Sequence, residues 1–110
     1  MIRLFILLIG ATLILPGCAG TSHYYRLDND KINIYLTNPN AERVLFLSSI
    51  DQFQPHEALK DKKGIWEVTL PSDKELRYFY IVDGKVFTPD CDQTDMDDLG
   101  GRNCIYVPGQ

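Results

Sequence analysis

Apolar and polar residues alternate with a period of two in several parts of the chain. Ile32, Ile34 and Leu36 occupy alternate positions, and their run ends at the turn sequence Asn-Pro-Asn. Short apolar or alternating runs follow at residues 44–47, 66–70, 78–82 and 104–107. Successive side chains of a β-strand point to opposite faces, so this period predicts strands that each bury one face.

Turn residues separate these runs, and no stretch beyond residue 17 sustains the apolar period of an amphipathic helix. The pattern therefore predicts an all-β fold, an antiparallel β-sandwich. Between two apolar runs, Asp83-Gly84 predicts a tight hairpin, because Gly accepts a positive φ without steric cost. Tyr78, Tyr80 and Val82 would then face the core.

The first 17 residues have the features of a secretory signal peptide. Arg3 precedes an uncharged apolar run at residues 4–15. Such a run extends about 18 Å as a helix, less than the ~30 Å hydrocarbon core, which disfavours a membrane-spanning helix. We expect residues 1–17 to be removed.

The sequence Leu-Pro-Gly-Cys at residues 15–18 resembles the lipobox of bacterial lipoproteins. This resemblance implies that Cys18 is diacylated and begins the mature chain, anchored to the membrane by its lipid. Residues 18–23 would form a tether and residues 24–110 the domain. Ala19 is not the aspartate associated with inner-membrane retention, which favours the outer membrane and a periplasmic or exterior location. The alternative is an ordinary secretory signal followed by an incidental cysteine.

Cys91 and Cys104 remain as one pair, and an oxidising compartment favours a disulfide between them. The short loop that it closes predicts a stabilisation of about 3 kcal/mol. A metal site is the alternative, but His23 and His56 lie far away in sequence and the ligand spacing of zinc sites is missing. We expect no metal and no other cofactor.

Charge disfavours nucleic acid as a partner. Removing residues 1–17 takes away Arg3 and leaves ten basic against fifteen acidic residues, a net charge of −5. Acidic residues concentrate near the C-terminus, at Asp90, Asp92, Asp95, Asp97 and Asp98. Their spacing is not that of a calcium-binding EF-hand loop, so a solvated loop is the preferred interpretation and calcium the alternative. No catalytic motif is present, which predicts a protein that is not an enzyme.

Two motifs in fixed order carry a resemblance to a known family. GIWEVTLP at residues 64–71 is followed by YFYIVDG at residues 78–84. This order resembles carbohydrate-binding module family 48, which includes the glycogen-binding domain of the AMP-activated protein kinase β-subunit. The resemblance covers about residues 42–108 and implies an early-set immunoglobulin-like sandwich that binds α-glucans. Trp66 would belong to a core strand.

In that family two tryptophans stack on glucose rings, while a lysine and an asparagine bind hydroxyl groups. The tryptophan positions correspond here to Phe53 and Val86, with Phe87 adjacent, and the lysine position to Phe79. The leucine and asparagine of the last loop are retained as Leu99 and Asn103. The resemblance thus implies a carbohydrate site with altered chemistry, made of Phe53, Phe79, Lys85, Phe87, Leu99 and Asn103.

Phe79 and Ile81 alternate with the predicted core residues and would face away from the core. Either a loop covers them or they belong to a binding surface. The functional expectation is a lipid-anchored envelope protein that binds an α-glucan or another envelope glycan without catalysis. The alternative is a module that contacts a protein partner or has a structural role, with no sugar binding.

Overall fold

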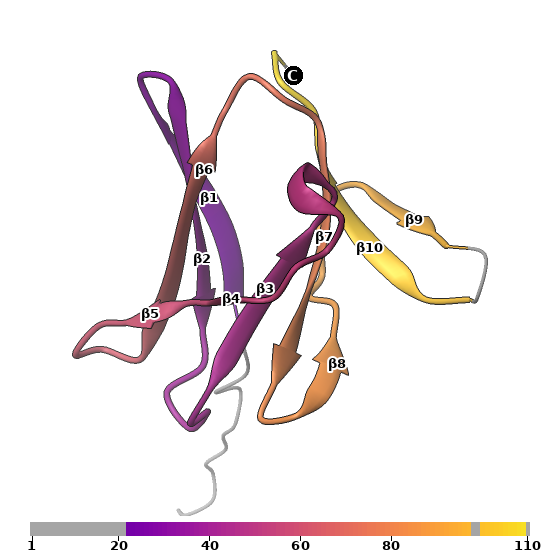
Figure 1. The fold of residues 1–110 in the computed structure, drawn as a ribbon. Coiled ribbons are helices and arrows are strands. Elements are labelled where there is room, and N and C mark those ends of the chain that lie inside the picture. The colour runs from indigo at the N-terminus through magenta and orange to yellow at the C-terminus, as the bar shows by residue number, and fades with distance from the viewer. Residues whose placement is uncertain (1–21, 98–99, 110) are drawn as a thin grey trace, which may run out of the picture.

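The computed structural model of the chain describes residues 22–97 and 100–109, which form two antiparallel sheets packed face to face (Figure 1). One sheet has the order β1 (Ser22–Asp28), β2 (Lys31–Thr37), β6 (Ile65–Pro71) and β5 (Leu59–Lys60). The other has the order β4 (His56–Glu57), β3 (Val44–Ser48), β7 (Leu76–Val82), β10 (Arg102–Tyr106) and β9 (Thr94–Met96), and β8 (Lys85–Phe87) also pairs with β7. A short 3₁₀ helix, η2 (Ser49–Asp51), follows β3. The predicted all-β, immunoglobulin-like sandwich is confirmed.

The core lies between the sheets and includes residues that the alternation predicted to face inward, together with others, such as Ala58 and Leu76, that were not predicted. On β2, Ile32, Ile34 and Leu36 are buried, and from the opposite sheet Tyr78 and Tyr80 pack against the same core. Trp66 is also buried, and its Nε1 donates a hydrogen bond to the carbonyl oxygen of Asn38 at 2.9 Å. The expected structural role of this tryptophan agrees with its position.

The predicted hairpin at Asp83-Gly84 joins β7 to β8, and both turn residues have positive φ, 49° and 84°. The Asp83 carboxylate also accepts hydrogen bonds from the backbone N–H groups of Glu42 and Arg43, at 2.9 and 2.8 Å. This contact fixes the hairpin to the chain segment that enters β3. The turn is therefore stabilised both by the pairing of β7 with β8 and by the hydrogen bonds of Asp83 to the segment before β3.

The predicted disulfide between Cys91 and Cys104 is present, with the two Cα atoms 5.7 Å apart. It connects the segment after β8 to β10, which pairs with β7 in the centre of its sheet. Thr88 Oγ1 donates a hydrogen bond to the Arg102 carbonyl at 2.6 Å and links the same two segments. The irregular chain between β8 and β9 is thus attached to the core sheet at two points.

Among the strands that were not predicted, β1 is the longest. β1 includes Ser22 and His23, which were assigned to the tether, and it forms a hairpin with β2 through a turn in which Asn29 has a φ of 59°. The rest of the predicted tether, the predicted signal peptide and Cys18 lie outside the described residues. Within the described part of the chain, no helix is long and apolar enough to cross a membrane.

Candidate ligand-binding face

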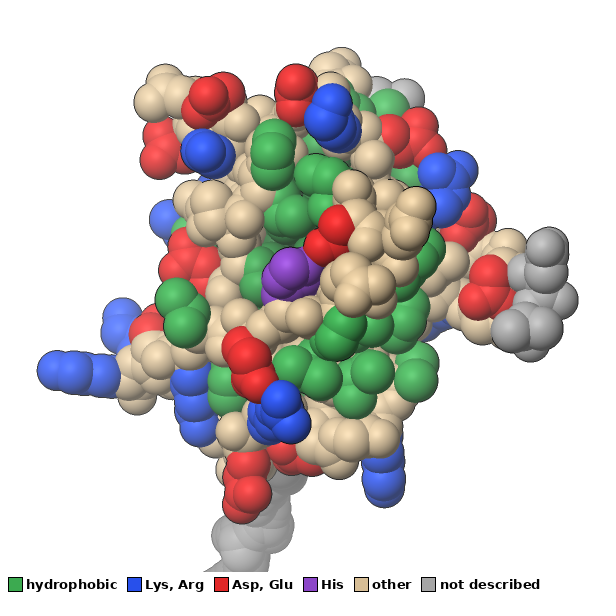
Figure 2. All heavy atoms as spheres, viewed as in Figure 1, with side chains coloured by type: hydrophobic (Ala, Val, Ile, Leu, Met, Phe, Trp, Pro, Cys, Tyr) green, Lys and Arg blue, Asp and Glu red, His purple; other side chains and the backbone are tan. Residues whose placement is uncertain are grey.

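The outer face of the six-stranded sheet, which points away from the core, carries a row of side chains from β7. Arg77, Phe79 and Ile81 alternate with the buried residues of that strand and are half-buried on this outer face. Across the ladder, Phe79 pairs with Leu47 and Ile81 pairs with Leu45 on β3. On the other side of β7, Val86 pairs with Ile81 and is 73% exposed. Figure 2 shows hydrophobic side chains gathered over this part of the sheet.

Phe53 reaches the same face from the loop after η2. Its ring stacks on that of Phe79, with centroids 5.9 Å apart and planes at 23°, and Phe53 remains 37% exposed. The Phe53 N–H donates to the Ser48 carbonyl at 2.7 Å, and the Arg77 N–H donates to Ser49 Oγ at 3.0 Å. These bonds attach both ends of the loop to the central strands.

The loop that positions Phe53 contains strained backbone. Gln52 and Phe53 both have a φ of 63°, a left-handed conformation that costs residues with a Cβ roughly 1–2 kcal/mol each. Asp51 stabilises the turn by accepting a hydrogen bond from the Gln54 N–H at 3.2 Å and by pairing with His56. The hydrogen bond from His56 holds the pKa of Asp51 below its usual value. Such strain is typical of functional loops, so the position of Phe53 is a feature that a function should explain.

A polar cluster adjoins the aromatic pair. Arg77 Nε donates to Asp95 Oδ2 at 2.6 Å, and Asn103 Nδ2 donates to Asp95 Oδ1 at 3.3 Å. The hydrogen bond from Arg77 is the main reason why the pKa of Asp95 lies below its usual value. Arg77 also pairs with Glu75. The cluster thus presents a fixed carboxylate, a guanidinium and an amide at the same edge of the face as Phe79.

The structure brings together three of the six residues predicted for the site. Phe53, Phe79 and Asn103 share the outer face, although Asn103 is only 7% exposed and already donates to Asp95. Val86, to which the resemblance assigned a tryptophan position, pairs with Ile81 and also lies on this face. Of the two interpretations of Phe79, the covering loop is present in part, because Phe53 stacks on Phe79 and remains exposed itself. The binding surface stays a prediction.

The other predicted residues lie elsewhere. Phe87 pairs with Tyr80 and packs against the core, so its ring belongs to the inner side of the sheet. Lys85 is exposed at the hairpin and, by the alternation of strand side chains, points to the same side as Phe87. Leu99 lies outside the described residues.

Two polar residues of the face, Arg77 and Asp95, were not predicted. Arg77 alternates with Tyr78 and so could have been assigned to the outer face from the sequence. Asp95 was assigned to the solvated acidic loop, and only the pairing of β9 with β10 brings it beside Arg77. In the described part of the chain, no group of three His, Cys, Asp or Glu side chains is arranged to hold a metal ion.

Comparison of the chain with protein-family models and with curated proteins finds no match. The chemistry of the face is therefore the basis for assigning a function.

Proposed function

We propose that the protein is a non-catalytic binding module that binds a glycan, with α-glucans as the first candidates, on the outer face of its six-stranded sheet. The observation that carries this proposal is the exposed Phe53 ring, stacked on Phe79 beside the cluster of Arg77, Asp95 and Asn103. The resemblance to carbohydrate-binding module family 48 supports the same ligand class.

The chemistry of a sugar ring fits this combination. The C–H face of a pyranose is apolar and packs on an aromatic ring, whereas its hydroxyl groups require hydrogen-bond partners at the rim. Phe53 supplies the aromatic surface. Arg77 supplies donors and Asp95 an acceptor, while their mutual hydrogen bond holds both side chains in place. Preorganised groups of this kind lose little conformational freedom when a ligand binds.

The aromatic surface available to a sugar on this face is smaller than that of a platform with two exposed tryptophans. Phenylalanine offers less surface than tryptophan, and Val86 offers no ring at all. We therefore expect weak binding that depends on several sugar units in contact at once, as in other multivalent interactions.

The test is electrophoresis of the purified full chain through native gels that contain glycogen, in a non-ionic detergent without a sugar headgroup. Glycogen should retard the wild-type protein, and both Phe53→Ala and Arg77→Met should reduce the retardation. Leu59→Ala is the matched control, because Leu59 is an exposed apolar residue on the other sheet. Wild-type protein whose migration is unchanged both by glycogen and by envelope glucans contradicts the proposal.

A second candidate function is contact with a protein partner. The observation that favours it is the apolar surface formed by the exposed Val86 and its neighbours Ile81 and Leu45, which present no polar donors. Under this alternative, Val86→Asp would abolish capture of a specific partner from the cell envelope. Glucan binding would be absent in the wild type, whereas the first proposal requires it.

We also propose that the mature chain begins at Cys18 and is anchored by lipid in the cell envelope. The lipobox-like sequence at residues 15–18 supports this location, as does the disulfide, which persists in oxidising compartments. Cys18→Ser should release the protein from membranes and abolish incorporation of labelled fatty acid. A variant that still partitions with membranes and still incorporates the label contradicts the anchor.

A further inference from the structure

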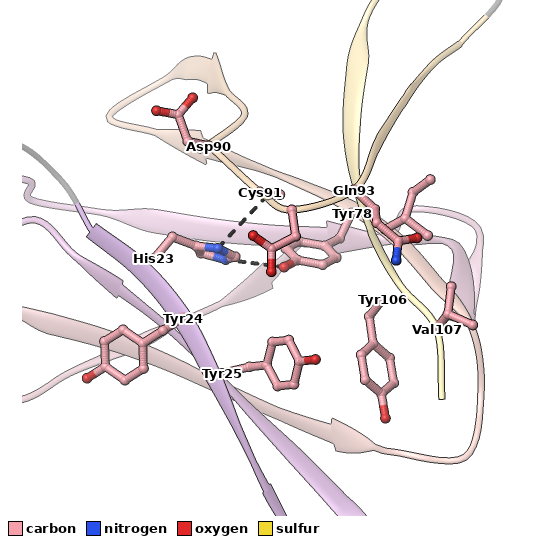
Figure 3. A pocket seen from close by; sticks show the side chains of 11 residues that line it. His23, Tyr24, Tyr25, Tyr78, Asp90, Cys91, Gln93, Tyr106 and Val107 are labelled. Carbon is pink, nitrogen blue, oxygen red and sulfur yellow. Dashed lines mark hydrogen bonds between the residues drawn. The ribbon is translucent and has the colours of Figure 1, made fainter. Parts of the chain in front are cut away.

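A second candidate site lies between the edges of the two sheets, away from the outer face described above. A cavity of about 410 Å³ opens between β1 of one sheet and the end of β10 with residues 90–93 of the other (Figure 3). A cavity of this size holds a small organic molecule. None of the residues predicted for the glycan site lines it.

Four tyrosines, Tyr24, Tyr25, Tyr78 and Tyr106, line this cavity together with His23. Figure 3 shows Tyr25, Tyr78 and Tyr106 around the same space, with His23 beside Tyr78. The rings of Tyr25 and Tyr106 meet edge to face with centroids 5.4 Å apart, and those of His23 and Tyr78 lie 5.7 Å apart. Tyr25 is 43% exposed, so part of its surface is available to a ligand.

The charge at the cavity is negative. Asp90 and Asp92 line it, and none of the lining residues in the described part of the chain is Lys or Arg. His23 does not compensate this charge, because burial lowers its pKa to about 4 and leaves it neutral at pH 7. Aromatic faces together with uncompensated carboxylates attract cations.

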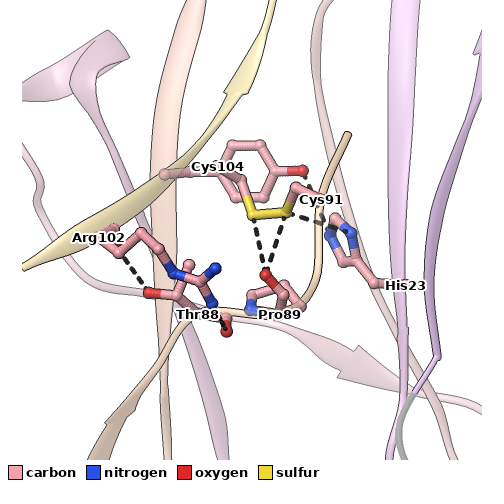
Figure 4. The surroundings of a disulfide bond; sticks show 7 residues. His23, Thr88, Pro89, Cys91, Arg102 and Cys104 are labelled. Carbon is pink, nitrogen blue, oxygen red and sulfur yellow. Dashed lines mark hydrogen bonds between the residues drawn. A yellow bond between two sulfur atoms is a disulfide. The ribbon is translucent and has the colours of Figure 1, made fainter. Parts of the chain in front are cut away.

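The disulfide holds the acidic wall in place. Cys91 directly precedes Asp92, and its bond to Cys104 attaches this segment to β10 (Figure 4). Both sulfur atoms also contact the Pro89 carbonyl oxygen, and the Ile105 N–H donates to the Gln93 carbonyl at 3.0 Å. The position of Asp92 relative to the tyrosines is therefore fixed by a covalent bond on one side and a backbone hydrogen bond on the other.

We infer that this cavity binds an organic ammonium ion, that is, a positively charged nitrogen that carries apolar substituents. The tyrosine rings would contact the apolar substituents and attract the charge through their π-faces. The Asp92 carboxylate would supply the balancing negative charge. The inference does not depend on the glycan proposal, because the two sites share no residue.

The test is titration of the full chain with choline, in a non-ionic detergent, followed by the amide NMR signals of Tyr25 and Asp92. The matched probe is the neutral analogue of choline in which a carbon atom replaces the nitrogen. Choline should shift these signals and bind at least about tenfold more tightly than the neutral analogue, since cation–π contacts and an adjacent carboxylate act only on the charged molecule.

Tyr25→Leu should weaken choline binding by about 3- to 30-fold. Asp92→Asn should weaken it by up to about fivefold, because the Asp92 carboxylate is exposed to solvent. The control variant is Tyr35→Leu, because Tyr35 lies on β2, stacks on Tyr24 at 4.9 Å and does not line the cavity. This variant should bind choline within about twofold of the wild type. Equal affinity for choline and its neutral analogue, or no choline-dependent shift at Tyr25 and Asp92 in the folded wild type, overturns the inference.

Discussion

The ring of Phe53 stacks on the ring of Phe79 although Phe53 lies in the loop after η2 and Phe79 lies on β7. Phe79 is placed by the alternation of β7, and Phe53 by a loop with two consecutive left-handed residues. The stack converts two separate apolar side chains into one surface beside Arg77 and Asp95. The proposed function depends on this relationship.

Trp66 should be essential for stability and not for binding. Trp66→Ala removes a large buried ring and should lower the free energy of unfolding by about 3–5 kcal/mol in denaturant titrations. Trp66→Phe keeps most of the volume but loses the hydrogen bond to the Asn38 carbonyl, so its cost should be smaller. A Trp66→Ala protein as stable as the wild type would show that this side chain is not in the core.

A side chain at Gly64 should destabilise the fold. Its φ is 83°, and a Cβ there would lie 2.5 Å from Pro39 Cβ. Gly64→Ala should therefore lower the free energy of unfolding by about 2–4 kcal/mol, from backbone strain and overpacking together. Gly84 is the matched control, with a φ of 84° and nothing within 4 Å of the added Cβ, so Gly84→Ala should cost only about 1 kcal/mol. Equal costs at the two positions would contradict the close contact with Pro39.

Reduction of the Cys91–Cys104 bond should destabilise the protein by about 3 kcal/mol, because the reduced unfolded chain gains conformational freedom. For a domain of this size, the thermal midpoint should fall by roughly 10–25 °C. The double variant Cys91→Ser, Cys104→Ser is the control, since a reductant should not change its midpoint. Mass spectrometry that finds both thiols free in protein isolated from cells would refute a native disulfide.

His23 should make stability depend on pH. Burial lowers its pKa from 6.5 to about 4 in the folded protein, so the unfolded chain binds a proton at a higher pH than the folded chain does. The stabilisation is therefore fully present above pH 6.5 and is lost as the pH falls from 6.5 to about 4. The total loss should be on the order of 3 kcal/mol.

The measurement is the free energy of unfolding of the wild type and of His23→Gln across this range. The variant should lose less stability than the wild type between pH 6.5 and 4. Below this range Asp51 and Asp95, whose pKa values are lowered by hydrogen bonds from His56 and Arg77, add a further loss in both proteins. Parallel pH profiles above pH 4 would show that His23 is not responsible.

The sequence predicted the central strands because their buried faces impose a strict alternation. Ile32, Ile34 and Leu36 on β2, and Tyr78 and Tyr80 on β7, could face only the core. β1 was missed because most of its side chains are exposed, so no inward row distinguishes it from a tether. The two- and three-residue strands β4, β5 and β9 depend on their partners and leave no pattern of their own.

The candidate site was only partly predictable for a related reason. Alternation placed Phe79 on the outer face. The contact with Phe53, however, requires left-handed backbone at Gln52 and Phe53. This conformation is uncommon for residues other than glycine, so the sequence did not predict it. The approach of Asp95 to Arg77 depends on the order of β9, β10 and β7 in the sheet. Phe87 was assigned to the site by its position next to Val86, whereas neighbouring strand residues point to opposite faces.

The most direct test of the proposed function is an NMR titration of the full chain with a linear maltooligosaccharide, in a detergent without a sugar headgroup. We predict saturable shifts in the signals of Phe53, Phe79, Arg77 and Asn103, with the four-stranded sheet unchanged. Absence of shifts at saturating oligosaccharide, or shifts confined to residues away from the outer face, would contradict glycan binding at this site.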